Sequence, residues 1–414
     1  MRRRLRRRPS GDAGSARVSV GTDRSSRWFI RSKTALRERY PCPRVKLRLS
    51  LLFAALALAV PAAASPPEVN ARAWLVQNAT TGEVLLRHED RARLPIASIT
   101  KLMTALVALE RADPTDVVTI TAASAGIGGS TINLRVGEKV SVQDLLEAAL
   151  IQSANDAASA LAVHAGGTET RFVALMNAKA RALALADTHF VRPDGLDVAG
   201  HVSSASDVTK LARVAMNQPV IREIVGMETE VAAGRPLDSW NDLLSTFPGL
   251  IGVKTGHTSD AGWSQVAAAR GRGLTVYATI LGSPTRSERN SDLTELLAWG
   301  LSRYRVVSVV RGGHVYATAA TPYSRPPVRL VAARPLVRVV RVDRPLVERV
   351  VTPAAVSLPV RRGQVLGEVQ VWAGAKLLGT RPLVAAESIA KPGLRGRISW
   401  YAERTLSNAW SFVS

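Results

Sequence analysis

Cysteine is almost absent from the chain: Cys42 is the single one among 414 residues. A lone thiol excludes an intramolecular disulfide. Cys42 also lies in an N-terminal segment that we expect to be removed, which excludes thiol catalysis and a cysteine-ligated zinc site in the mature protein. Such a protein depends on core burial for its stability, and a hydrophobic content of 46% over 414 residues is enough for two domains.

Long hydrophobic runs are also scarce, and the run at residues 49–60 is too short to cross a membrane comfortably. Basic residues precede this run and Pro61-Ala62-Ala63-Ala64 follows it, a pattern typical of a secretory signal peptide cleaved after Ala64. An uncleaved N-terminal anchor is the alternative. Because residues 1–44 are long for the charged region of a signal peptide, we expect translation to begin later, for example at Val45. The sequence thus predicts an exported protein of the cell envelope, on the outer face of the cytoplasmic membrane.

Acidic residues are few at both ends of the chain. Residues 1–64 hold 16 Lys and Arg against 3 Asp and Glu, residues 306–414 hold 16 against 5, and residues 65–305 hold 23 against 25. The net charge of +22 therefore comes from two basic ends around a nearly neutral central block. No nucleic-acid-binding motif accompanies the basic residues, so nucleic acid is not an expected partner. The basic tail instead favours an anionic lipid or cell-wall polymer surface.

The central block, residues 65–305, has the pattern of a mixed sheet with a helical insert. Two apolar runs around a Thr-Thr-Gly turn predict a hairpin at residues 72–88. A helix that is apolar on nearly every face, and therefore buried, is expected at residues 99–109. Further strands are expected near residues 250–254, 263–270 and 274–281, and further helices at residues 140–164 with a break near Ser153, 172–185, 206–216 with Ser206 as N-cap, and 292–304.

After Tyr304 helical periodicity disappears, and Pro, Val and Arg dominate. Residues 306–391 predict a small β-rich domain, with short strands and a hairpin. Residues 392–414 predict an amphipathic tail helix that suits a membrane interface, the alternative being a helix packed on the β-rich domain. The apolar side of this helix holds Leu394, Ile398, Tyr401, Ala402, Leu406, Ala409, Phe412 and Val413.

Three short motifs carry the chemistry of the central block. They are Ser98-Ile-Thr-Lys101, Ser153-Ala-Asn155 and Lys254-Thr255-Gly256. Taken singly, each has a plain structural interpretation: a helix-capping serine with a surface lysine, a second helix cap, and a strand end. Their order, their gaps of 55 and 101 residues and the apolar segments around them argue against coincidence.

A serine and a lysine three residues apart share one face of a helix. The Ser98 hydroxyl is a poor nucleophile until a neighbour takes its proton. Lys101 can do so only as a neutral amine, so its pKa must fall from about 10.4. Burial would lower this pKa, and so would a second cation nearby, for which Lys254 is the candidate.

The other two motifs offer groups that handle a peptide. The Ser153 hydroxyl can relay a proton to a leaving amine, and the Asn155 carboxamide can hold a peptide amide. The Lys254 ammonium and the Thr255 hydroxyl suit a terminal carboxylate. Gly256 lets a ligand lie close to the strand backbone.

The three motifs form a known set, and with segments such as ASITKLMTALVALE and GVKTGHTSDAGWS they give the chain a family likeness. From about Ala73 to Tyr304 the chain resembles the low-molecular-mass penicillin-binding proteins that are D-alanyl-D-alanine carboxypeptidases. The resemblance implies an α/β (α+β) catalytic domain of the serine β-lactamase and penicillin-binding-protein type with a helical insert, followed by a small β-rich domain. It also implies removal of the terminal D-Ala from peptidoglycan stem pentapeptides through an acyl-enzyme, binding of β-lactam antibiotics such as penicillin, and no need for a metal or cofactor.

The resemblance also assigns roles by position. Ser98 is implied as the acylated nucleophile, Lys101 as its general base and Ser153 as the proton shuttle. Asn155 would position the peptide, and Lys254 and Thr255 would hold the terminal carboxylate beside Gly256. The backbone N–H groups of Ser98 and His257 would form the oxyanion hole. His201 and Asp207 are expected to be structural.

Two positions depart from the family pattern. Ala154 stands where glycine is usual, and Trp240 stands before Asn241, where some members carry a basic residue. Three alternatives stay open: a D,D-endopeptidase on the same scaffold, an inactive cell-wall-binding protein, and a class A β-lactamase. The last family uses a Glu-x-x-Leu-Asn loop, and none of Glu169, Glu223 and Glu228 begins one.

Overall fold

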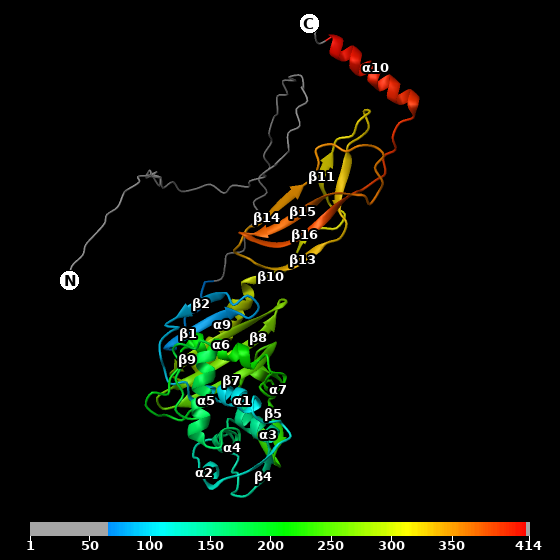
Figure 1. Cartoon of the computed structure of the whole chain (residues 1–414). Helices are drawn as coiled ribbons and strands as arrows, with labels where there is room; N and C mark the ends of the chain where they lie inside the picture. Colours follow the sequence, from blue (N-terminus) through cyan, green and yellow to red (C-terminus); the bar gives the residue numbers. More distant parts are fainter. Residues whose placement is uncertain (1–64, 411–414) are drawn as a thin grey trace, which may run out of the picture.

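The computed structural model describes residues 65–410 (Figure 1). The predicted signal peptide, Cys42 and the start at Val45 lie outside the described residues, as do Phe412 and Val413. The part of the chain that precedes the β-rich part is called the first region here. The sheet at its centre has five antiparallel strands in the order β2-β1-β9-β8-β7. Their bounds are β1 Ala73–Asn78, β2 Val84–His88, β7 Leu250–Thr258, β8 Gly262–Gly271 and β9 Leu274–Ser283. The predicted hairpin at residues 72–88 and the three later strands are therefore confirmed.

Helices cover both faces of this sheet. On one face lies α9 (Arg286–Ser302), whose Leu293, Leu296 and Leu297 are fully buried in one cluster with Val76 and Val276 of the sheet. The helical insert covers the other face, and its core is continuous with the opposite side chains of β1, β8 and β9. Burial on both faces explains why β8 and β9 have near-continuous apolar sequences.

The insert contains most of the helices of the first region. Eight of the nine residues of α1 (Lys101–Leu109) are buried, which confirms the expected buried helix. The expected N-cap Ser206 is wrong: α6 begins at Ala205 and its cap is Ser204, whose Oγ accepts the Asp207 N–H at 3.2 Å. The other elements are η1 Ala97–Thr100, β3 Val117–Thr119, α2 Ala122–Ala125, β4 Lys139–Ser141, α3 Val142–Glu147, η2 Ala148–Gln152, α4 Asn155–Gly166, α5 Glu169–Ala182, α6 Ala205–Ala215, α7 Pro219–Ile224, β5 Thr229–Ala232, β6 Arg235–Asp238 and α8 Leu243–Thr246.

The region after α9 is β-rich, as expected, and has a separate hydrophobic core. Its strands form a pair, β10-β13, and a five-stranded sheet in the order β11-β12-β16-β15-β14. The bounds are β10 Tyr304–Val310, β11 Val315–Ala319, β12 Val328–Ala332, β13 Leu336–Arg341, β14 Leu346–Val351, β15 Val365–Ala373 and β16 Lys376–Ala385. A separate core supports the domain boundary near residue 305, which stays a prediction.

Ion pairs join the two regions. Glu83, in the turn between β1 and β2, pairs with Arg341 at 2.8 Å and also with Arg344. Arg303, at the end of α9, pairs with Asp343 at 2.9 Å. These contacts connect the β-rich region to the end of α9 and to the β1-β2 turn. The β1-β2 hairpin forms the edge of the central sheet opposite to β7.

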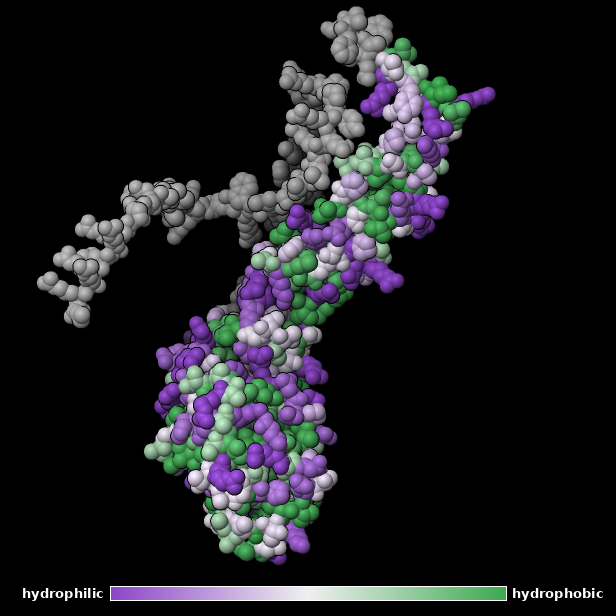
Figure 2. All heavy atoms as spheres, in the orientation of Figure 1, coloured by the Kyte–Doolittle hydropathy of each residue, from purple (hydrophilic) through white to green (hydrophobic). Residues whose placement is uncertain are grey.

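The chain continues into α10 (Leu394–Trp410), which extends from the end of the β-rich region (Figure 1). No helix within residues 65–410 is long and apolar enough to span a membrane. The apolar side chains of α10 are exposed, with Leu394 at 66% and Leu406 at 62%, and apolar and polar residues lie side by side on its surface (Figure 2). Its ring contacts with the β-rich region are those of Trp400 and Tyr401 with Tyr323.

Candidate active site

Ser98 lies in the 3-10 helix η1, one turn before Lys101 begins α1. Its side chain is half-buried and therefore accessible, whereas Lys101 is fully buried. The Lys101 Nζ atom lies 2.8 Å from Ser98 Oγ. The sequence spacing predicted this contact, because residues three apart in a helical turn lie on one face.

The other contacts of Lys101 Nζ determine which way its hydrogens point. Nζ donates to Asn155 Oδ1 at 2.7 Å and to the backbone carbonyl of Asp194 at 2.7 Å. Both atoms only accept hydrogen bonds, so they take the two N–H groups of a neutral amine. The lone pair of that amine is then left for the Ser98 hydroxyl proton, which is the geometry that a general base needs.

Burial of Lys101 lowers its pKa from 10.5 to about 7. The nearby Asp194 carboxylate raises this pKa and the Arg192 guanidinium lowers it, but desolvation has the largest effect. Arg192 is a cation near Lys101 that was not expected, and the expected cation, Lys254, is also coupled to Lys101 by charge repulsion. The pKa of Lys254 is itself well below its ordinary value, first through burial and then through the charges of Lys101 and Arg289.

The second motif forms the predicted break between two helices. Ser153 follows η2 with left-handed backbone angles (φ 63°, ψ 31°), and α4 begins at Asn155. The Asn155 N–H donates to the Ser130 carbonyl at 2.7 Å and its Nδ2 donates to Gly128 at 2.8 Å, so its Oδ1 faces Lys101. Ala154 is fully buried in the core, which explains why a methyl group is tolerated where glycine is usual.

The third motif lies on β7, the edge strand of the central sheet nearest to η1. Lys254 is buried and its Nζ donates to Ser153 Oγ at 3.0 Å and to the Thr255 carbonyl at 3.1 Å. A Cβ added at Gly256 would lie 2.7 Å from the carbonyl oxygen of Ile96, so this glycine allows β7 to approach η1 closely. The His257 side chain is exposed and stacks on Trp263 at 3.9 Å between ring centroids, which fits a residue that acts through its backbone.

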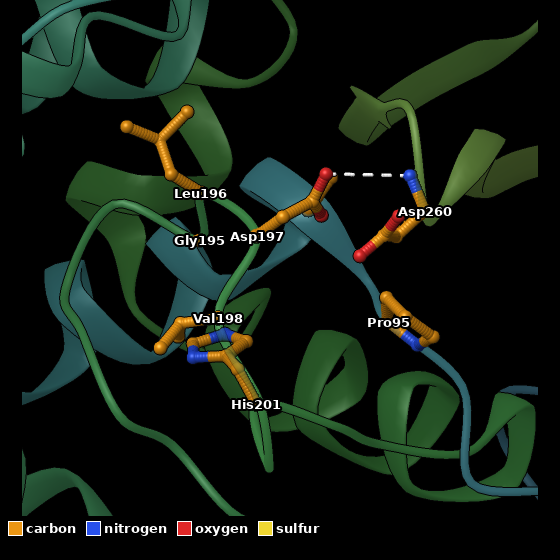
Figure 3. A pocket seen from close by; sticks show the side chains of 8 residues that line it. Pro95, Gly195, Leu196, Asp197, Val198, His201 and Asp260 are labelled. Carbon is orange, nitrogen blue, oxygen red and sulfur yellow. Dashed lines mark hydrogen bonds between the residues drawn. The ribbon is translucent and has the colours of Figure 1, made fainter.

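A small recess lies beside η1, lined by Ala97, Gly195, Asp197, His201 and Asp260 among others (Figure 3). Gly195 has a φ of +87°, and an added Cβ would lie 2.0 Å from the Ala97 carbonyl oxygen, so only glycine fits here. His201 bonds with Thr100 Oγ1 at 2.7 Å and its Nδ1 accepts the Val191 N–H at 3.1 Å, which makes it part of the support of η1, as expected of a structural residue.

The three motifs therefore meet through two sets of contacts: Lys101 joins Ser98 to Asn155, and Lys254 joins the third motif to Ser153. Sequence reasoning missed the Asp194 carbonyl, which receives one hydrogen of Lys101. A backbone acceptor leaves no signal in residue types, and only the Pro-Asp-Gly turn around it marked the position.

Comparisons with known proteins agree with this geometry. The model of peptidase family S11, described as D-alanyl-D-alanine carboxypeptidase, matches residues 60–285. The chain is 30% identical to the D-alanyl-D-alanine carboxypeptidase DacD of Salmonella typhimurium, over 83% of this chain and 92% of that protein. It is also 30% identical to DacC of Escherichia coli, over 84% of this chain and 91% of the relative.

Solved structures give the same result. Penicillin binding protein 6B from Escherichia coli superposes with a TM-score of 0.60 at 28% identity, covering 78% of this chain and 98% of that chain. The Streptomyces K15 DD-transpeptidase has a TM-score of 0.55 at 32% identity and covers 58% of this chain. The predicted resemblance and fold class are thus confirmed, and the chain belongs to the D-alanyl-D-alanine carboxypeptidases of peptidase family S11.

Proposed function

We propose that the protein is a serine-type D-Ala-D-Ala carboxypeptidase that removes the terminal D-Ala from peptidoglycan stem pentapeptides and is acylated by β-lactams. The observation that carries the proposal is the Lys101 amine, fully buried, 2.8 Å from Ser98 Oγ and with both of its hydrogens taken by acceptors. The family membership, and relatives named as D-alanyl-D-alanine carboxypeptidases and penicillin-binding proteins, support it.

The proposed acylation step uses each motif once. Ser98 Oγ attacks the carbonyl carbon between the two D-alanines, and its proton passes to Lys101 Nζ. The backbone N–H groups of Ser98 and His257 stabilise the oxyanion, a contribution of roughly 3–4 kcal/mol per donor in other serine hydrolases. The C–N bond breaks as the Ser153 hydroxyl gives its proton to the leaving nitrogen and takes up the proton that Lys101 accepted, so that D-Ala departs and Lys101 is neutral again.

Deacylation reverses the roles. A water molecule gives its proton to the neutral Lys101 amine and attacks the ester carbonyl, the bond to Ser98 Oγ breaks, and the serine recovers its proton.

Asn155 holds the peptide, and Lys254 and Thr255 hold the terminal carboxylate with charge-assisted hydrogen bonds during the acylation step. None of these steps requires a metal or cofactor.

The test is the release of D-Ala from a synthetic stem pentapeptide. We expect release by the wild-type protein and none by the Ser98→Ala variant. The same peptide with a terminal L-Ala is the matched substrate control. Release that persists in Ser98→Ala would refute the assignment, and absence of both release and penicillin binding in the wild type would favour the inactive wall-binding alternative.

A D,D-endopeptidase is the second candidate, because the chain is 34% identical to a D-alanyl-D-alanine endopeptidase of Pseudomonas aeruginosa over 61% of its length. Cross-linked muropeptide dimers separate the two activities: a carboxypeptidase trims free pentapeptides faster than it opens the dimer. Rapid turnover of penicillin, rather than a stable adduct, would instead favour a β-lactamase.

For its location, we propose an exported enzyme that acts in the cell envelope and lies on the membrane surface through α10. The exposed apolar side chains of Leu394, Ile398 and Leu406 support this proposal, since they are not covered by the β-rich region. We expect the full-length protein to sediment with anionic lipid vesicles and a chain ending at Lys391 to stay in the supernatant. Equal sedimentation of both would contradict a role for the helix.

A further inference from the structure

The proposed mechanism uses the Ser153 hydroxyl as a proton relay, and in the structure this hydroxyl accepts a hydrogen bond from Lys254 Nζ. Ser153 has a φ of 63°, a left-handed conformation that is costly for a residue with a Cβ. The plane of the preceding peptide group, between Gln152 and Ser153, sets this angle. If the Gln152 carbonyl turned, φ of Ser153 could relax to negative values and its Oγ would leave Lys254 Nζ, now 3.0 Å away.

Two side chains from distant parts of the sequence donate hydrogen bonds to the Gln152 carbonyl. Ser130 Oγ donates to this oxygen at 2.9 Å, and the indole Nε1–H of Trp240 donates to it at 3.2 Å. The segment around Trp240 makes a further contact, because the Asp238 N–H donates to Gln152 Oε1 at 3.1 Å. The carbonyl oxygen therefore accepts two side-chain hydrogen bonds, and turning its peptide plane would break both.

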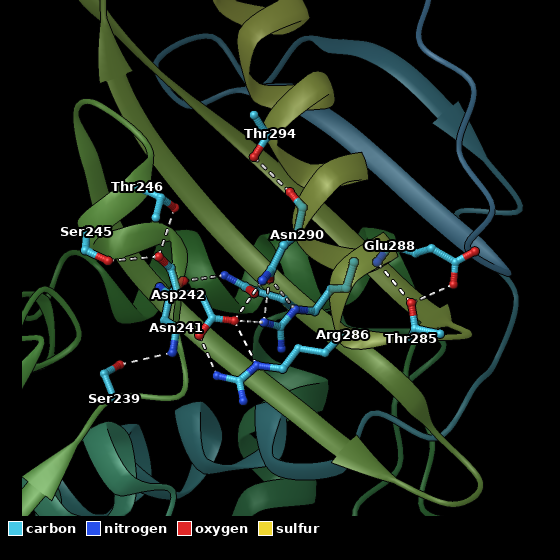
Figure 4. A network of polar contacts seen from close by, with 12 residues as sticks. Ser239, Asn241, Asp242, Ser245, Thr246, Thr285, Arg286, Glu288, Asn290 and Thr294 are labelled. Carbon is cyan, nitrogen blue, oxygen red and sulfur yellow. Dashed lines mark hydrogen bonds and ion pairs between the residues drawn. The ribbon is translucent and has the colours of Figure 1, made fainter.

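The indole of Trp240 is itself held in place by a contact with a cation. The guanidinium of Arg286 lies over its ring, 5.3 Å from the centroid. Arg286 is fixed by two hydrogen bonds to Asp242, at 2.8 and 2.5 Å (Figure 4). Asp242 also accepts from Arg289 at 3.2 Å and from Asn290 at 2.7 Å, so the first turns of α9 anchor this network.

We infer that Trp240 is a positioning residue that keeps Ser153 in its proton-relay conformation through the Gln152 carbonyl. This inference rests on the proposed function of the site. It gives a role to a position where the sequence departs from the basic residue of some family members. Here an indole occupies that position and acts on the turn of the second motif.

The test is a double-mutant cycle with penicillin acylation as the readout. Trp240→Phe keeps the ring against Arg286 and removes the single N–H donor, so we expect acylation to slow about fivefold, the effect of one neutral hydrogen bond. With the peptide substrate, kcat should fall while KM stays unchanged. In a Ser153→Ala background, Trp240→Phe should cause no further slowing, because its effect passes through the hydroxyl that is already gone.

Trp74→Phe, on β1 and outside the site, is the matched control and should acylate as the wild type does. Ser130→Ala removes the other donor to the same carbonyl and should behave like Trp240→Phe, which keeps the test decisive should one variant misfold. Wild-type acylation rates in Trp240→Phe and Ser130→Ala, or the same fold-loss from Trp240→Phe with and without Ser153, would overturn the inference. A wild-type protein and a Trp74→Phe control that both fail to react with penicillin would instead overturn the proposed function.

Discussion

The pH dependence of acylation should report the titration of the Lys101 amine. Burial lowers the pKa of this group to about 7. Since only the neutral form accepts the Ser98 proton, about a tenth of the protein is active at pH 6 and about nine tenths at pH 8. The acylation rate should therefore rise about tenfold between pH 6 and pH 8 and then level off. A lysine with an ordinary pKa would give about a hundredfold rise over this interval with no plateau.

The assay is the rate constant for acylation by a fluorescent penicillin at constant ionic strength from pH 5.5 to 9.5. Arg192→Gln supplies the matched perturbation, because the Arg192 charge lowers the pKa of Lys101. Removing this charge stabilises the protonated Lys101 amine and raises its pKa, so the midpoint of the profile should move to higher pH. Arg91→Gln, which removes an exposed guanidinium paired with Asp187, should leave it unchanged. A wild-type rate that still climbs steeply above pH 9 would refute the reasoning.

Three further predictions concern other parts of the molecule. Gly195→Ala should lower the free energy of unfolding in urea by more than about 2 kcal/mol, because the added Cβ meets a carbonyl oxygen. Gly200→Ala, also at positive φ but in open space, should lower it by about 1 kcal/mol. Equal losses in the two variants would contradict this. Lys254→Ala should lower kcat/KM for the pentapeptide by about 100-fold or more, and a change below about threefold would exclude a role at the carboxylate. Glu83→Gln removes the carboxylate that pairs with both Arg341 and Arg344, and the loss of stability should be at most about 1 kcal/mol and should vanish at high salt. A salt-independent loss would contradict an ionic contact.

The sequence predicts the elements of the first region well because its signals are local. The buried helix at residues 99–109 is apolar on nearly every face, and the middle residues of β8 and β9 are buried on both faces of the sheet. Boundaries are predicted less well. The expected helix at residues 292–304 begins earlier, at Arg286, with Thr285 as its N-cap. Because its first turns carry polar side chains, apolar periodicity does not reveal them.

The sequence predicted the side chains of the candidate site, but not the backbone carbonyls that position them. Motif spacing indicated Ser98, Lys101, Ser153 and Lys254 because chemistry selects their residue types. The Asp194 and Gln152 carbonyls, which fix Lys101 and Ser153, are backbone atoms that any residue supplies. Their part depends on segments that meet only in the fold, and no composition or periodicity could reveal it.

The most direct test of the central claim is to locate the ester that penicillin forms. The protein is incubated with penicillin at pH 8, denatured, digested and mapped by mass spectrometry. We predict one penicilloyl adduct, carried by the peptide that contains Ser98 and absent from the Ser98→Ala variant. An adduct of normal yield in Ser98→Ala, or one on a peptide without Ser98, would contradict the claim that the buried Lys101 amine activates this serine.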